Sequence, residues 1–226
     1  MMRASRILVR RRDFERFLAH AAPSFEEIAG RDARHPERAA VYGFALAPGG
    51  RDGGGDRRVV EVFYGTRHLE GRTEYVSRDG LPPRRHHRSV GEWGATLEYQ
   101  RMDNGTVLCT LSPAGSENFR RHERTVFVEW IRATDRLRSK AMLERHWRLL
   151  ASYMEVTSLE GEPTLTDRLR VGWVLFTRSR IVGKEYDAAP VRVWIWRLLT
   201  FAATVGLSGF LLALVQWIFS APNPPP

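Results

Sequence analysis

The residues most suited to chemistry form a short basic cluster near the middle of the chain. The cluster consists of Arg84, Arg85, His86, His87 and Arg88. Guanidinium groups bind phosphate and carboxylate groups strongly, and their concentrated positive field attracts anions. The same arginines disfavour a metal cation at the two histidines. The cluster therefore predicts anion binding, with a solvated loop as the alternative.

Motifs that indicate a catalytic centre are absent from the sequence. It contains no GxSxG elbow, no GxxxxGK[ST] phosphate loop, no GxGxxG after a strand, no HExxH and no acidic calcium loop. Cys109 is the only cysteine, so a disulfide within the chain and a cysteine-rich zinc site are excluded. We therefore expect no metal and no cofactor, and we favour a protein without enzymatic activity.

An enzyme that acts on an anionic substrate is the alternative to this interpretation. Such an enzyme would need a concave site where a basic residue, from the cluster or at His122, lies beside a carboxylate. Cys109 is expected to be a small buried side chain on a strand, as free cysteines commonly are.

The charge of the chain favours acidic partners. Lysine and arginine number 35 against 26 aspartates and glutamates, which gives a formal net charge of +9. An excess of this size attracts anionic lipid head groups or nucleic acid. No aromatic residue is interleaved with the basic cluster, and such residues are the stacking platforms of many nucleic-acid sites. We therefore expect membrane lipids as partners and disfavour nucleic acid.

A long apolar segment near the C-terminal end predicts a membrane anchor. Residues 198–219 contain no charged residue, and a helix of this length spans about 33 Å, close to the ~30 Å hydrocarbon core of a bilayer. Trp194, Trp196 and Trp217 lie near its ends, where indole favours the head-group boundary. A buried core helix is the alternative, but an uncharged run of this length is unusual for one. We predict one transmembrane helix over residues 198–219.

Basic residues precede the predicted span, and none follows it. They are Arg178, Arg180, Lys184, Arg192 and Arg197. Because positive charge stays on the cytoplasmic side of a membrane, we expect the preceding domain to be cytoplasmic and residues 220–226 to be translocated. Each of these five residues is a candidate for contact with a lipid head group, worth ~1 kcal/mol near an anionic surface.

Small residues recur at a spacing of four within the predicted span. Ala202 and Gly206 form one such pair, and Gly209 and Ala213 form another. Small residues at this spacing let two membrane helices approach closely, which favours association. The pattern also arises by chance in spans rich in alanine and glycine, so self-association through this face is left open.

Alternating apolar residues and turn residues predict the sheet. Predicted strands cover residues 41–47, 58–64, 73–77, 96–100, 106–111 and 125–131. The sequence Asp-Asn-Gly at residues 103–105 favours a tight hairpin, and the glycine-rich residues 48–55 connect another pair of strands. Five or six strands in hairpin order indicate an antiparallel sheet. Residues 78–88, which contain the whole basic cluster, are predicted to be a polar loop.

Apolar residues at helical spacing predict the flanking helices. One covers residues 5–30 with a break or kink at Pro23, a second covers residues 134–156, and a third begins near Pro163 and has its body at residues 169–182. The third helix carries arginines beside its apolar face, which favours contact with a lipid surface over a place in the core. The predicted fold class is α+β, an antiparallel sheet of five or six strands with flanking helices, plus one C-terminal transmembrane helix.

These predictions divide the chain into four parts. Residues 1–185 form a basic cytoplasmic α+β domain, 186–197 a juxtamembrane linker, 198–219 the transmembrane helix and 220–226 a short translocated tail. We expect a tail-anchored, single-pass protein whose domain acts as a scaffold, subunit or sensor at the inner face of a bacterial-type membrane. A protein partner or a second copy of the chain is expected beside the lipids. An oligomerising membrane effector gated by ligand or partner binding is a further alternative.

Overall fold

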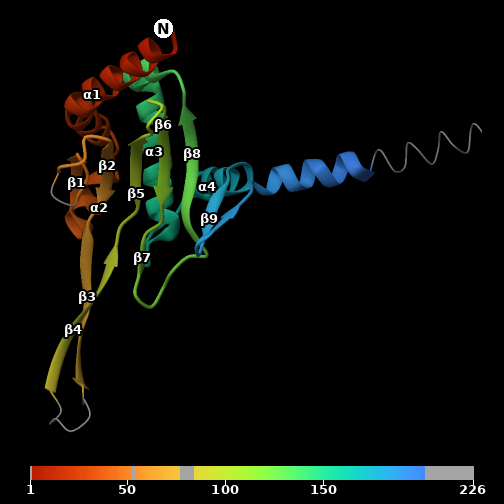
Figure 1. Cartoon of the computed structure of the whole chain (residues 1–226). Helices are drawn as coiled ribbons and strands as arrows, with labels where there is room; N and C mark the ends of the chain where they lie inside the picture. Colours follow the sequence, from red (N-terminus) through yellow and green to blue (C-terminus); the bar gives the residue numbers. More distant parts are fainter. Residues whose placement is uncertain (1, 52–53, 77–83, 202–226) are drawn as a thin grey trace, which may run out of the picture.

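The computed structural model describes residues 2–51, 54–76 and 84–201 (Figure 1). Within this part the fold is α+β, with antiparallel strand pairing and flanking helices, as the sequence predicts. The helices are α1 (Met2–Ala29), α2 (His35–Tyr42), α3 (Lys140–Thr157) and α4 (Leu165–Thr177), with a 3-10 turn at Thr134–Arg138. Residues 190–201 are also helical.

The described strands form two sheets. The strands are β1 (Phe44–Pro48), β2 (Val59–Tyr64), β3 (Thr66–Val76), β4 (Arg84–Trp93), β5 (Thr96–Arg101), β6 (Val107–Ser112), β7 (Gly115–Ser116), β8 (Glu123–Ile131), β9 (Arg180–Val182) and β10 (Glu185–Asp187). The larger sheet has the order β1-β2-β5-β6-β8-β9-β10, and the smaller has the order β3-β4-β7. Ten strands in the described residues exceed the predicted five or six. β7, β9 and β10 are too short to produce an alternating pattern, and β4 begins in a segment predicted to be a loop.

The two hairpins predicted from turn residues are confirmed. β1 pairs with β2 and β5 pairs with β6, each in antiparallel register. In the turn between β5 and β6, Gly105 has a φ of 79°, and the side chain of Asn104 accepts a hydrogen bond from the backbone N–H of Thr106 at 3.0 Å. Glycine adopts this left-handed conformation without the steric cost that a side chain would add.

Three helix predictions need correction. α1 continues through Pro23 without a break, because a face that includes the buried Phe14, Phe17, Phe25 and Ile28 packs on the core and outweighs one lost backbone hydrogen bond. The helix predicted over residues 134–156 is divided at Ser139 into a 3-10 turn and α3. The helix predicted to continue to residue 182 ends at Thr177 instead.

The segment after α4 forms a strand because the edge of β8 offers backbone partners. β9 pairs with β8 through Glu123↔Val182, Thr125↔Ile181 and Val126↔Arg180. Backbone groups at a free sheet edge are unpaired, so an added strand satisfies both partners. Residues 180–182 therefore extend the sheet rather than the helix.

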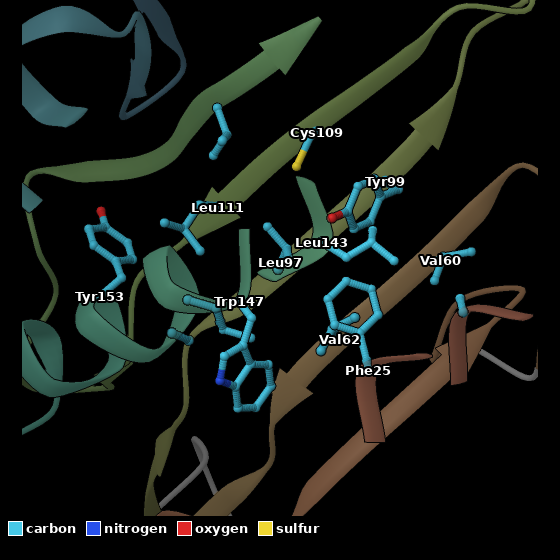
Figure 2. Packing of buried hydrophobic residues seen from close by; sticks show 14 of the residues in the cluster. Phe25, Val60, Val62, Leu97, Tyr99, Cys109, Leu111, Leu143, Trp147 and Tyr153 are labelled. Atoms are coloured by element: carbon cyan, nitrogen blue, oxygen red, sulfur yellow. The ribbon is translucent and has the colours of Figure 1, made fainter. Parts of the chain in front are cut away.

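The core lies on one face of the larger sheet (Figure 2). Val60, Val62, Leu97, Tyr99, Cys109 and Leu111 come from the strands, and they face Phe25 of α1 and Leu143, Trp147 and Tyr153 of α3. In β2 the residues alternate between half-buried and buried, as a strand covered on one face requires. The core therefore fixes α1 and α3 against the sheet.

Cys109 is a buried side chain on β6, as predicted for it. Burial, with the nearby Glu129 carboxylate, raises the pKa of its thiol well above the ordinary value. The thiolate is the reactive form of cysteine, so we expect the native protein to be inert toward an aromatic disulfide reagent, and the denatured protein to react at once. Release of the coloured thiolate measures this. Rapid stoichiometric reaction under native conditions would contradict the buried position.

Candidate membrane-facing surface

The helix at residues 190–201 exposes apolar side chains around its whole circumference, with Arg192 and Arg197 among them. Val193, Trp194, Ile195 and Trp196 occupy four consecutive positions, which together cover the whole circumference of a helix, and all four are exposed. Trp196 has 72% of its surface exposed, and Leu199 has 57%. In Figure 1 this blue helix projects away from the sheet, on the side of α4 and β9. A helix that is hydrophobic all round is normally buried in a core or in a membrane.

The predicted span begins in this helix and continues outside the described residues. Within the described part of the chain, no helix is both long enough and apolar enough to cross a membrane. The association candidates Ala202, Gly206, Gly209 and Ala213 lie outside the described residues. Of the predicted linker, residues 186–187 belong to β10 and residues 190–197 to the helix.

A second apolar surface lies on α4. Leu165, Leu169, Trp173 and Phe176 are all exposed, and their spacing places them on one face of the helix. We call these four residues the α4 stripe. The opposite face packs on the domain through Asp167, Val171 and Val174. One face of α4 therefore packs on the core, and the α4 stripe on the other face is open to solvent.

The position of α4 is fixed at its first turn. The Thr164 side chain accepts a hydrogen bond from the N–H of Asp167, and the Asp167 carboxylate accepts one from the N–H of Thr164, which forms a capping box. Asp167 also accepts hydrogen bonds from Ser152 at 2.7 Å and Arg34 at 3.0 Å. Although burial opposes the shift, these bonds lower the pKa of Asp167 well below its ordinary value. The α4 stripe is therefore held rigidly outward.

The predicted head-group residues are distributed around these two surfaces. Arg178 follows the end of α4, Arg192 and Arg197 lie on the helix at residues 190–201, and Lys184 lies in the turn between β9 and β10. Within the described residues, these four side chains form no ion pair. Arg180 differs, because it lies on β9 and its Nε is 2.8 Å from the Asp187 carboxylate. Four of the five candidates are thus available to an anion.

The basic cluster is not part of this surface. Residues 84–88 begin β4 and pair with β3 through Val76↔Arg84, Tyr75↔Arg85 and Thr73↔His87, so the predicted loop is wrong for this segment. Successive positions of a strand alternate between its two faces, so the five positions do not converge on one point. In Figure 1 the β3–β4 hairpin, which belongs to the smaller sheet, extends beyond the end of the larger sheet.

Among the described residues, a hollow beside His122 meets part of the requirement for an enzyme site. This hollow of about 630 Å³ is lined by residues that include His122, Glu61 and Glu98. Glu61 and Glu98 are cross-strand partners on β2 and β5. Burial raises the pKa of Glu98, the neighbouring Glu61 adds to the shift and Arg51 opposes it. The basic cluster does not contribute to the described lining of this hollow.

Comparisons with protein-family models, curated proteins and solved structures found no match to this chain. In the described residues, no group of three or more His, Cys, Asp or Glu side chains is placed to hold a metal ion. The function is therefore inferred from the chemistry of the surfaces themselves. The sequence favoured an apolar face of this helix toward lipid, but the residues of that face were not identified, although the spacing of Leu165, Leu169, Trp173 and Phe176 was available as a signal.

Proposed function

We propose that this chain is a membrane-attached protein whose α+β domain serves as a scaffold, subunit or sensor at the lipid surface. The observation that carries the proposal is the exposed circumference of the helix at residues 190–201, at Val193, Trp194, Ile195 and Trp196. Exposed apolar surface of this extent marks an interaction with a membrane or a protein. The uncharged residues that continue to residue 219 favour the membrane.

The α4 stripe and the free cations support the same proposal. Helices at a lipid interface place apolar residues toward the acyl chains and arginines or lysines beside them. α4 combines its stripe with Arg168 and Arg178, which are both exposed. With the basic residues on the domain side of the span, we propose that the domain lies on the cytoplasmic side.

Alkaline extraction of membranes tests the proposal. We expect the full chain to stay in the membrane pellet after a carbonate wash, because only integral proteins resist it, and a chain that ends at Ala189 to enter the supernatant. The deletion starts at residue 190 rather than 198, since Val193–Trp196 are exposed as well. A chain that lacks only residues 220–226 is the matched control and should stay in the pellet.

Circular dichroism and size exclusion of the shortened chain show whether the released domain is folded. Complete extraction of the full chain by carbonate would overturn membrane insertion. A shortened chain that stays in the pellet although folded would place the attachment elsewhere.

A further inference from the structure

Two adjoining hollows follow one side of α4. The first, of about 360 Å³, lies between α3, α4 and β8, and the second, of about 270 Å³, lies where the end of α4, β8 and the start of the helix at residues 190–201 meet. They share Val128, Glu129, Thr177 and Arg178 in their linings. Together they form a track that leads from the α3–α4 contact to the base of the projecting helix.

Arginines dominate the charge of this track. Five arginines from three helices and the segment after α4 line it, and Glu129 is the only carboxylate in the described lining. We call them the arginine row: Arg145, Arg148, Arg170, Arg178 and Arg192. The row brings together cations that are far apart in the sequence. It does not include the basic cluster at residues 84–88.

Few internal partners neutralise the arginine row. Glu129 is already shared by Arg145, by Arg136 at 2.9 Å and by His146 at 3.3 Å. Arg170 is 3.6 Å from the Asp167 carboxylate. Within the described residues, Arg148, Arg178 and Arg192 form no ion pair. Three guanidinium groups in adjoining hollows are therefore left for an external anion.

A buried histidine, His146, lines the first hollow without adding to its charge. Burial lowers the pKa of His146 to about 4, and Arg145 and Arg136 contribute, although Glu129 opposes the shift. His146 is thus neutral at physiological pH and does not add to the charge of the row. The excess charge in the track belongs to its arginines.

We propose that the arginine row binds the phosphate group of an anionic phospholipid, an inference that rests on the membrane attachment proposed above. Guanidinium groups match phosphate oxygens with paired hydrogen bonds. The hollows, at about 360 and 270 Å³, suit a head group rather than a whole lipid. Trp173 and Tyr186, both exposed, border the two hollows, and amphipathic aromatics of this kind favour the head-group boundary.

We assign a lipid as the occupant because the track ends at the exposed apolar helix at residues 190–201. Arg192 lines the second hollow and lies on the apolar helix itself. Trp173 belongs both to the first hollow and to the α4 stripe. A head group in the track would place its acyl chains beside surfaces that are already apolar.

The test uses the full chain reconstituted in nanodiscs of phosphatidylcholine, alone or mixed with an equal amount of phosphatidylglycerol. Thermal unfolding of the wild type is expected at a Tm about 5 °C higher in the mixed discs, the rise that a saturating ligand gives a chain of this size. The double variant Arg148→Gln, Arg178→Gln should lose most of that rise. Both side chains are exposed and form no ion pair in the described residues, so its Tm in neutral discs should match the wild type.

The control variant Arg57→Gln, Arg132→Gln removes the same charge from exposed positions outside the track. It should keep the full rise, and an equal loss in both variants would overturn the proposal by assigning the effect to diffuse surface charge. A rise of the same size from glycerol 3-phosphate in neutral discs would overturn the lipid assignment. Co-elution of the chain with neutral discs separates the two proposals. If the chain enters neutral discs but its Tm does not rise with phosphatidylglycerol, only the proposed lipid binding by the arginine row is wrong. If the chain enters neither kind of disc, the proposed membrane attachment is wrong.

Discussion

The substitution Glu92→Ala is expected to lower the free energy of unfolding by about 3–5 kcal/mol, the usual cost of breaking a buried ion pair from one side. Glu92 is completely buried at the end of β4. Its carboxylate accepts hydrogen bonds from the Tyr42 hydroxyl at 2.8 Å, the Arg67 Nε at 2.7 Å and the Leu159 N–H at 2.6 Å. Removal of the carboxylate takes the acceptor from two neutral donors and leaves Arg67 with the exposed Glu160 as its remaining carboxylate partner.

The cost is large because Glu92 joins three segments. Tyr42 ends α2, Arg67 lies on β3, and Leu159 follows α3. Burial and the hydrogen bond to Glu92 raise the pKa of Tyr42 above its ordinary value, so its hydroxyl stays a donor. The base of the β3–β4 hairpin is thereby fixed to the helical side of the domain.

Chemical denaturation of the full chain in a neutral detergent measures the effect. Glu160→Ala is the matched control, since Glu160 binds the same arginine but has 77% of its side chain exposed. Exposed ion pairs contribute about 0–1 kcal/mol, so the control should change little. Similar losses in the two variants would show that burial of the Glu92 network does not determine the cost.

Local sequence signals predicted the parts of the fold that short segments determine. The β5–β6 hairpin follows from Asn104-Gly105 between two alternating segments, because the turn residues and the strand period agree. α3 follows from apolar residues at helical spacing. The fold class could be predicted because these signals depend only on residues that are close together in the sequence.

Other features depend on contacts that the sequence pattern does not contain. β9 exists because the edge of β8 is open, although residues 180–182 lie beside a strong helical pattern. β4 takes up Arg84 to Arg88 because β3 pairs with it, although arginine and histidine are not strong strand formers. Tertiary pairing overrides weak local preference in both segments.

The candidate site likewise contains residues that the sequence predicted and residues that only the packing of helices brings together. The exposed helix follows from the apolar segment, and Arg178 and Arg192 were found from their place before it. Arg170 was expected only as one of several arginines beside the apolar face of its helix. Arg145 and Arg148 were missed, because they join the row only when α3 packs against α4. An arginine on a helix is ordinary by itself, and its meaning comes from the residues across the contact.

Stability is expected to fall by about 2 kcal/mol between about pH 7 and about pH 5, through the protonation of one buried histidine. His146 is fully buried. Its Nε2 is 3.3 Å from Glu129, which can only accept, so Nε2 carries the proton and Nδ1 accepts from the Tyr99 hydroxyl at 2.7 Å. The neutral ring thus satisfies both partners. Burial, aided by Arg145 and Arg136 and opposed by Glu129, lowers the pKa of His146 in the folded state to about 4 from an ordinary value of 6.5.

The sign follows from where the proton binds. Between the folded and the ordinary pKa values, the unfolded chain binds a proton that the native chain refuses, so acid favours unfolding in that window. The carboxylates Glu129 and Asp167, whose pKa values are lowered in the native state, add their loss only at lower pH. His35, whose pKa burial and Arg38 also lower, leaves a smaller residual slope.

Denaturation of the full chain in neutral detergent at the two pH values measures this loss. His146→Gln keeps a donor for Glu129 and an acceptor for Tyr99 but does not titrate, so most of the pH dependence should disappear in that variant. His20→Gln replaces an exposed histidine and should keep the slope of the wild type. An unchanged slope in His146→Gln would show that the proton is taken up elsewhere, and that the native fold does not lower the pKa of His146.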